Sequence, residues 1–95
     1  MNSFAFVIPV YMHGTTLAPI VEELARFQYP IILVDDGNPP EVCAYLEQAQ
    51  QACPLVHIVT RAKNGGKGAA VISGMFKAEE LGVSPEALAT ATYGR

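Results

Sequence analysis

Three short apolar runs alternate along the chain with segments of helical periodicity, and this alternation constrains the fold more than any other feature. The runs lie at 4–10, 31–34 and 55–59. Continuous apolar runs suit strands that are buried on both faces of a parallel sheet. Strands that alternate with helices imply right-handed crossovers. The sequence therefore predicts an α/β fold of βαβαβα order, with a mostly parallel sheet in a three-layer, Rossmann-like arrangement.

Capping and breaking residues predict where the helices begin and end. A threonine cap at 15 or 16 starts the first helix, which runs to 27. The second helix begins at 38–41, where an asparagine cap precedes two prolines and a glutamate, and it ends before Pro54. The third helix covers roughly 68–81, and Gly82 is typical of the position that follows a helix end.

Composition narrows the class of protein. The chain has 95 residues, of which 51% are apolar and 16% charged, so it is long enough for one domain and too apolar to be intrinsically disordered. Its net charge of −3 argues against a general nucleic-acid-binding protein. The basic group is centred on 61–67, whereas residues 1–60 carry six acidic residues against one base. This local positive charge suits a small anion better than a polyanion.

The sequence predicts neither export nor a membrane segment. The first apolar run is short and contains Pro9, which does not fit a signal peptide or a membrane span. Cys43 and Cys53 lie ten residues apart on one predicted helix, roughly 15 Å along its axis, which is too far for a disulfide. Their spacing does not suggest a zinc site. Two reduced cysteines are typical of a cytoplasmic protein, which is the location that we expect.

An unusual cluster of residues follows each predicted strand. The clusters lie at 9–14, 35–37 and 61–68. The carboxyl ends of parallel strands meet at one edge of the sheet, where α/β proteins bind their ligands. We therefore expect the three clusters to form a common binding site.

Two adjacent aspartates directly follow the second apolar run. Carboxylates are costly to bury there unless they are solvated, hydrogen-bonded or paired with a charge. In one interpretation Asp35 caps the turn and Asp36 is merely exposed. In the other, one carboxylate accepts hydrogen bonds from local backbone, and the other accepts from the N–H groups of a nucleobase or from a ribose hydroxyl.

The loop at 64–68 has the sequence Asn-Gly-Gly-Lys-Gly and leads into the third helix. Glycines allow the backbone to approach a ligand closely, and a helix N-terminus favours an anion. Lys67, with Lys63 or Arg61, could supply the positive charge that a diphosphate needs. The loop matches neither a Walker A sequence nor a complete dinucleotide-binding sequence. The alternative is a flexible turn whose small residues allow close packing of helix on sheet.

Taken together, three sequence blocks resemble the beginning of a family 2 glycosyltransferase with the GT-A fold. The blocks are Val-Ile-Pro-Val-Tyr at 7–11, Val-Asp-Asp-Gly at 34–37 and Asn-Gly-Gly-Lys-Gly-Ala-Ala at 64–70. The branch nearest dolichyl-phosphate mannose synthase is the most similar, and the resemblance runs from residue 4 to about 82. It implies the nucleotide-binding half of a GT-A domain, with an incomplete sheet, and a UDP- or GDP-sugar as the donor.

The resemblance also implies roles for residues of the first two blocks. In the family, the positions of Pro9 and Tyr11 line the nucleobase. Asp36 corresponds to the aspartate that accepts hydrogen bonds from the base. Asp35 corresponds to its structural or ribose-side partner.

In the third block, Gly65 and Lys67 fall where the family's loop approaches the nucleoside and the diphosphate. The family continues with a fourth strand that ends in Asp-x-Asp, whose carboxylates hold Mg²⁺ or Mn²⁺ against the diphosphate. No aspartate follows Asp36 in this sequence. We therefore predict no catalytic residue and no metal ligand in this chain, and we expect the metal only in the full-length family.

The tail at 83–95 departs from the family pattern. We expect residues 1–82 to form the nucleotide-sugar-binding part and the tail to be a divergent ending, from a truncation or a frameshift. The Ser-Pro-Glu at 84–86 indicates a short helix over 85–91 rather than a strand. The first strand would then keep an open edge, which would favour self-association.

Two functions from different classes fit these observations. The first is the N-terminal fragment of a glycosyltransferase, which binds the nucleotide of the donor, with sugar transfer expected only of the full-length enzyme. The second is a small stand-alone binding or receiver-like regulatory module that uses Asp35 or Asp36 as a phosphoacceptor. Binding of UDP or GDP would favour the first, and Mg²⁺-dependent labelling by a small phosphodonor would favour the second.

Overall fold

The computed structural model describes residues 4–10, 17–61, 66–84 and 87–90, and it has alternating strands and helices. The elements in chain order are β1 (Ala5–Val10), α1 (Leu17–Ala25), β2 (Ile31–Asp36), α2 (Pro40–Ala52), β3 (Val56–Arg61), α3 (Gly66–Glu80) and β4 (Leu88–Thr90). The first six elements confirm the predicted βαβαβα order. Among the described residues, no helix is both long enough and apolar enough to cross a bilayer.

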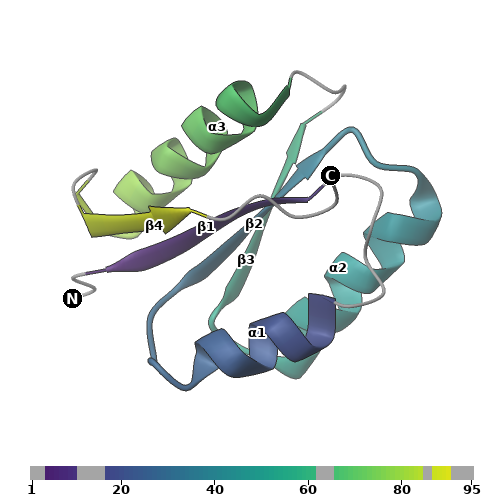
Figure 1. The fold of residues 1–95 in the computed structure, drawn as a ribbon, viewed down its shortest axis with the longest axis horizontal. Coiled ribbons are helices and arrows are strands. Elements are labelled where there is room, and N and C mark those ends of the chain that lie inside the picture. Colours follow the sequence, from purple (N-terminus) through teal and green to yellow (C-terminus); the bar gives the residue numbers. More distant parts are fainter. Residues whose placement is uncertain (1–3, 11–16, 62–65, 85–86, 91–95) are drawn as a thin grey trace.

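The strands form one parallel sheet in the order β3-β2-β1-β4 (Figure 1). Helices α1 and α2 cover one face of the sheet and α3 covers the other, which gives the three predicted layers. The pairing places Val10 beside Asp35 and Asp36 beside Arg61. The carboxyl ends of β1, β2 and β3 therefore lie at the same edge of the sheet.

Alternation along β2 divides the core between the two faces. All six residues of β2 are buried, as expected for a central strand that is covered on both sides. Ile31 and Leu33 pack toward α1 and α2, whereas Ile32 and Val34 pack toward α3. The same alternation sends Asp35 and Asp36 to opposite faces, because successive strand residues point to opposite sides.

The start of α2 differs from the prediction. Asn38 was expected to cap this helix, but Pro39 occupies the capping position and no side chain caps the helix there. The amide of Asn38 instead donates to the carbonyl of Val10 and to Asp35. Proline has no N–H group, so Pro39 and Pro40 leave two fewer backbone donors for a cap to satisfy.

Helix α3 ends as the sequence predicts. Gly82 has φ +84°, the left-handed conformation that glycine adopts without strain. The Gly82 amide donates to Glu79 O and the Val83 amide to Ala78 O, each at 3.0 Å, which satisfies carbonyls of the last turn. Val83 is buried against the α3 face of the sheet. The first helix is shorter than predicted, since α1 ends at Ala25 and a turn follows.

The prediction of a short helix over 85–91 was wrong for 88–90, whereas residues 85, 86 and 91 lie outside the described part of the chain. Residues Leu88–Thr90 form β4, which pairs in parallel with Ala5–Val7 of β1 (Figure 1). Without a neighbouring strand, this edge of β1 would carry unpaired N–H and C=O groups. An extended segment that pairs with them gains the hydrogen bonds of a ladder, whereas a short isolated helix is only marginally stable. This stretch of β1 is therefore not an open edge, so the expected self-association has no support there. The predicted division of the chain at 82 remains a prediction.

Candidate functional site

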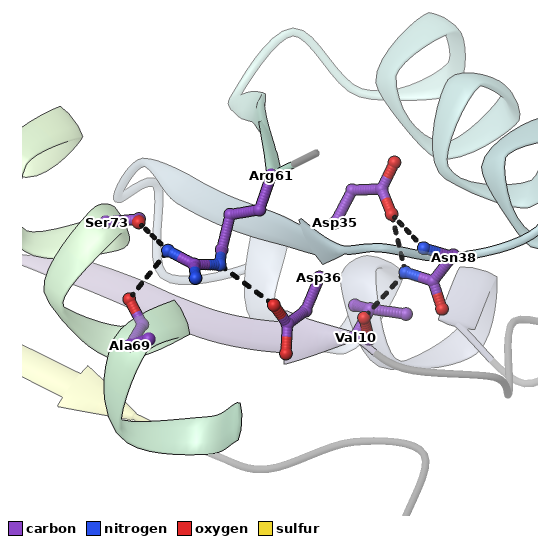
Figure 2. A network of polar contacts seen from close by, with 7 residues as sticks. All are labelled: Val10, Asp35, Asp36, Asn38, Arg61, Ala69 and Ser73. Carbon is purple, nitrogen blue, oxygen red and sulfur yellow. Dashed lines mark hydrogen bonds and ion pairs between the residues drawn. The ribbon is translucent and has the colours of Figure 1, made fainter. Parts of the chain in front are cut away.

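Polar side chains gather where β1, β2 and β3 end (Figure 2). Asp35 and Asp36 are the last residues of β2, and Arg61 is the last residue of β3. The segments 11–16 and 62–65, which follow β1 and β3 in the chain, lie outside the described residues. The described part of the site consists of two networks, one around each aspartate.

Asp35 lies in the first network, which ties the ends of β1 and β2 to α2. Only 4% of this residue is exposed. Its Oδ1 accepts from the Asn38 backbone N–H at 3.1 Å and from Asn38 Nδ2 at 2.6 Å, and its Oδ2 accepts from Cys43 Sγ at 3.1 Å. Asn38 Nδ2 also donates to Val10 O at 2.7 Å. These contacts agree with the interpretation that Asp35 stabilises the turn after β2.

Cys43 is affected chemically by this network. The hydrogen bond to Asp35, partial burial and the nearby negative charges raise the pKa of the Cys43 thiol to about 11. The protonated thiol is the form that the fold favours. The protonated Cys43 thiol therefore contributes its full stabilisation of the folded state below pH 9. This contribution is lost as the pH rises through about 11, where the thiol of the folded protein loses its proton.

We expect this shift to be visible in the reactivity of the thiol. In a Cys53→Ala variant, where Cys43 is the remaining cysteine, the rate of alkylation by iodoacetamide should rise with a midpoint near pH 11. The measurement is the rate of modification against pH by mass spectrometry. Adding Asp35→Asn to this variant should move the midpoint downward. A midpoint near 9.0 in the folded Cys53→Ala variant would contradict the expectation.

Asp36 lies in the second network, on the opposite face of the sheet. Only 3% of this residue is exposed, and its Oδ1 accepts from Arg61 Nε at 2.9 Å. Arg61 Nη1 donates to Ser73 Oγ at 2.9 Å and to Ala69 O at 3.4 Å, both on α3 (Figure 2). The interpretation of Asp36 as merely exposed was therefore wrong. Its burial is balanced by a charge-assisted hydrogen bond to a neighbouring strand.

Sequence reasoning missed this ion pair and the part played by Ser73. It considered Arg61 as a source of charge for a diphosphate, whereas the structure commits Nε and Nη1 to the protein itself. One signal could have found the pair. The ends of the second and third apolar runs, aligned as neighbouring parallel strands, set Asp36 opposite Arg61.

The six predicted nucleotide-binding residues are only partly described. Asp35 and Asp36 lie together at the end of β2, and Pro9 is the second-last residue of β1, paired with Val34. Tyr11 and Gly65 lie outside the described residues. Lys67 lies in the first turn of α3, and its side chain is not described. The geometry thus brings three of the six to one edge of the sheet.

Two other observations limit what the described residues can hold. Over the described ranges, no group of three or more His, Cys, Asp or Glu side chains could hold a metal ion. Asp35 and Asp36 accept from thiol, amide and guanidinium donors, so they do not form a set of ligands for a divalent cation.

A groove of about 620 Å³ lies between α1 and α2, lined by residues such as Tyr45 and Leu55, away from both aspartates.

The fold is that of an α/β protein whose two buried aspartates lie at the carboxyl ends of its parallel strands, the edge where such proteins commonly bind ligands. The chain matches the family model for glycosyl transferase family 2 over residues 5–80, which is most of its length. The chain belongs to this family. A search of curated proteins found no significant match.

Proposed function

We propose that the chain binds the nucleotide of a UDP- or GDP-sugar at the edge where β1, β2 and β3 end. We further propose that it has the nucleotide-binding half of a GT-A domain, of the branch nearest dolichyl-phosphate mannose synthase. Membership of glycosyl transferase family 2 supports a sugar donor. The observation that carries the proposal is the buried carboxylate of Asp36 at the end of β2, beside β3 and α3.

The two aspartates have different roles in this proposal. Asp36 accepts a hydrogen bond from a ring N–H of the nucleobase, namely N3–H of uracil or N1–H of guanine. A carboxylate can accept several hydrogen bonds, so its contact with Arg61 is compatible with this role. Asp35 holds the turn after β2 through Asn38 and thereby fixes the position of Asp36.

The remaining binding groups follow from the family resemblance. Pro9 and Tyr11 line the base, and Gly65 and Lys67 approach the nucleoside and diphosphate. Sugar transfer needs groups beyond these. In the full-length family, Mg²⁺ or Mn²⁺ neutralises the departing diphosphate. No aspartate follows Asp36 in the sequence, so we expect the 95 residues alone to bind the nucleotide without transferring sugar.

Calorimetric titration with UDP and GDP tests this function. We expect one of the two to bind the purified chain and Asp36→Asn to weaken that binding by about 10-fold or more, because a hydrogen bond to a charged acceptor is lost. Glu47→Gln is the matched control, because this substitution removes the same negative charge from an exposed residue of α2. The proposal fails if neither nucleotide binds, or if Asp36→Asn binds as well as Glu47→Gln.

The receiver-like alternative is not favoured. The chain belongs to glycosyl transferase family 2, which supports a nucleotide-sugar donor rather than a phosphodonor.

A further inference from the structure

Arg61 is held by contacts to two other elements. It ends β3, and its guanidinium lies between the end of β2 and the first half of α3 (Figure 2). Nε donates to Asp36 on β2, and Nη1 donates to Ser73 and Ala69 on α3. The side chain is about one quarter exposed, with a relative exposure of 25%. A planar guanidinium with donors fixed at two of its nitrogens has little freedom to turn.

This anchoring restrains Asp36 in turn. The Asp36 side chain has 5% relative exposure, and its Oδ1 lies 2.9 Å from Arg61 Nε. The strand pairing sets the two residues opposite one another, so the contact follows from the register of β2 and β3. Ser73 Oγ, at 2.9 Å from Nη1, fixes the far end of the guanidinium. The carboxylate is thereby held by a chain of contacts that reaches α3.

We infer that Arg61 is a positioning residue for nucleobase recognition, because it holds the Asp36 carboxylate in the orientation that accepts the ring N–H of the base. This inference rests on the proposed function. Arg61 acts through Asp36 and does not touch the nucleotide. It therefore contributes to discrimination between bases that carry the ring N–H and bases that lack it, more than to binding of the ribose or diphosphate.

The test compares each nucleotide with an analogue whose ring N–H is methylated. The pairs are UDP with 3-methyluridine 5′-diphosphate and GDP with 1-methylguanosine 5′-diphosphate, measured by calorimetry. For the pair that binds, the unmodified protein should prefer the unmethylated nucleotide by about 10-fold or more. In Arg61→Met this preference should fall below about 3-fold, mainly through weaker binding of the unmethylated nucleotide.

Two further variants separate positioning from folding. Arg61→Lys keeps the positive charge but loses the planar guanidinium with its several fixed donors. If Arg61→Met folds poorly, Arg61→Lys should restore part of the preference for the unmethylated nucleotide. Ser73→Ala removes one anchor of the guanidinium and should lower the preference by less than Arg61→Met does. Arg26→Met is the matched control, because Arg26 pairs with Glu23 on the exposed surface.

Each outcome bears on a different claim. If neither nucleotide binds the unmodified chain, the proposed function fails and the inference fails with it. If the unmodified chain prefers the unmethylated base and Asp36→Asn abolishes this, the proposed function stands. The inference alone is then overturned by any of three results. These are Arg61 variants that keep the full preference for the unmethylated nucleotide, that bind that nucleotide more tightly than the unmodified chain does, or that lose affinity equally for the unmethylated and the methylated nucleotide.

Discussion

Gly74→Ala is expected to destabilise the fold by at least about 2 kcal/mol, although alanine is the better helix former by about 1 kcal/mol. Gly74 lies in α3, where the helix packs on β1 and β2. A Cβ at this position would overlap Val7 Cγ1 and would lie 3.2 Å from Val34 Cγ2. Both valines are fully buried and β-branched, so neither can turn away cheaply. A larger side chain, as in Gly74→Leu, should prevent folding.

The measurement is urea denaturation followed by far-ultraviolet circular dichroism. Gly68→Ala on the same helix is the control, because a Cβ there would meet nothing within 4 Å. That substitution should leave the free energy of unfolding unchanged or raise it by up to about 1 kcal/mol. Equal stability of the two variants would show that α3 does not lie this close to the sheet.

Asp35→Asn is expected to destabilise the fold by about 2–3 kcal/mol, the second large effect. The carboxylate accepts from the Asn38 backbone N–H, from Asn38 Nδ2 and from Cys43 Sγ in a site that is almost closed to water. An amide replaces one acceptor oxygen with a donor, which would face one of these donors. The turn between β2 and α2 should then loosen.

Two readouts test this expectation. The free energy of unfolding from urea denaturation gives the size of the effect. Hydrogen exchange should be faster at the backbone N–H of Asn38 in the variant than in the unmodified protein. Glu47→Gln on α2 is exposed and should change the free energy by less than about 0.5 kcal/mol. An Asp35→Asn variant as stable as Glu47→Gln would mean that Asp35 does not hold this turn.

The layout of the fold was predictable because it depends on local patterns. The apolar runs are long enough for buried strands, and prolines and glycines mark where the helices stop. Gly82 shows this clearly, since a glycine is typical of the position that follows a helix end, and here it has a φ of +84°. The start of α2 was less predictable. Asn38 has the side chain of a helix cap, but Pro39 takes the capping position and Asn38 Nδ2 donates to the carbonyl of Val10, 28 residues earlier in the chain.

The end of the described chain shows the limit of local patterns. Leu88–Thr90 has weak strand character and follows a helix-start signal, yet it forms β4. The ladder with Ala5–Val7 supplies what the segment's own propensity lacks. A prediction from the segment alone does not include the strand edge beside which it lies.

Asp35 and Asp36 mark the boundary between what the sequence determines and what the tertiary structure decides. The sequence by itself determined that two adjacent carboxylates stand at the end of a buried strand. Only the tertiary structure decided that Asp35 accepts hydrogen bonds from Asn38 and Cys43, and that Asp36 accepts from Arg61. The physical reason is that a buried carboxylate needs partners within hydrogen-bond distance, and those partners come from other elements, brought close by strand register and helix packing.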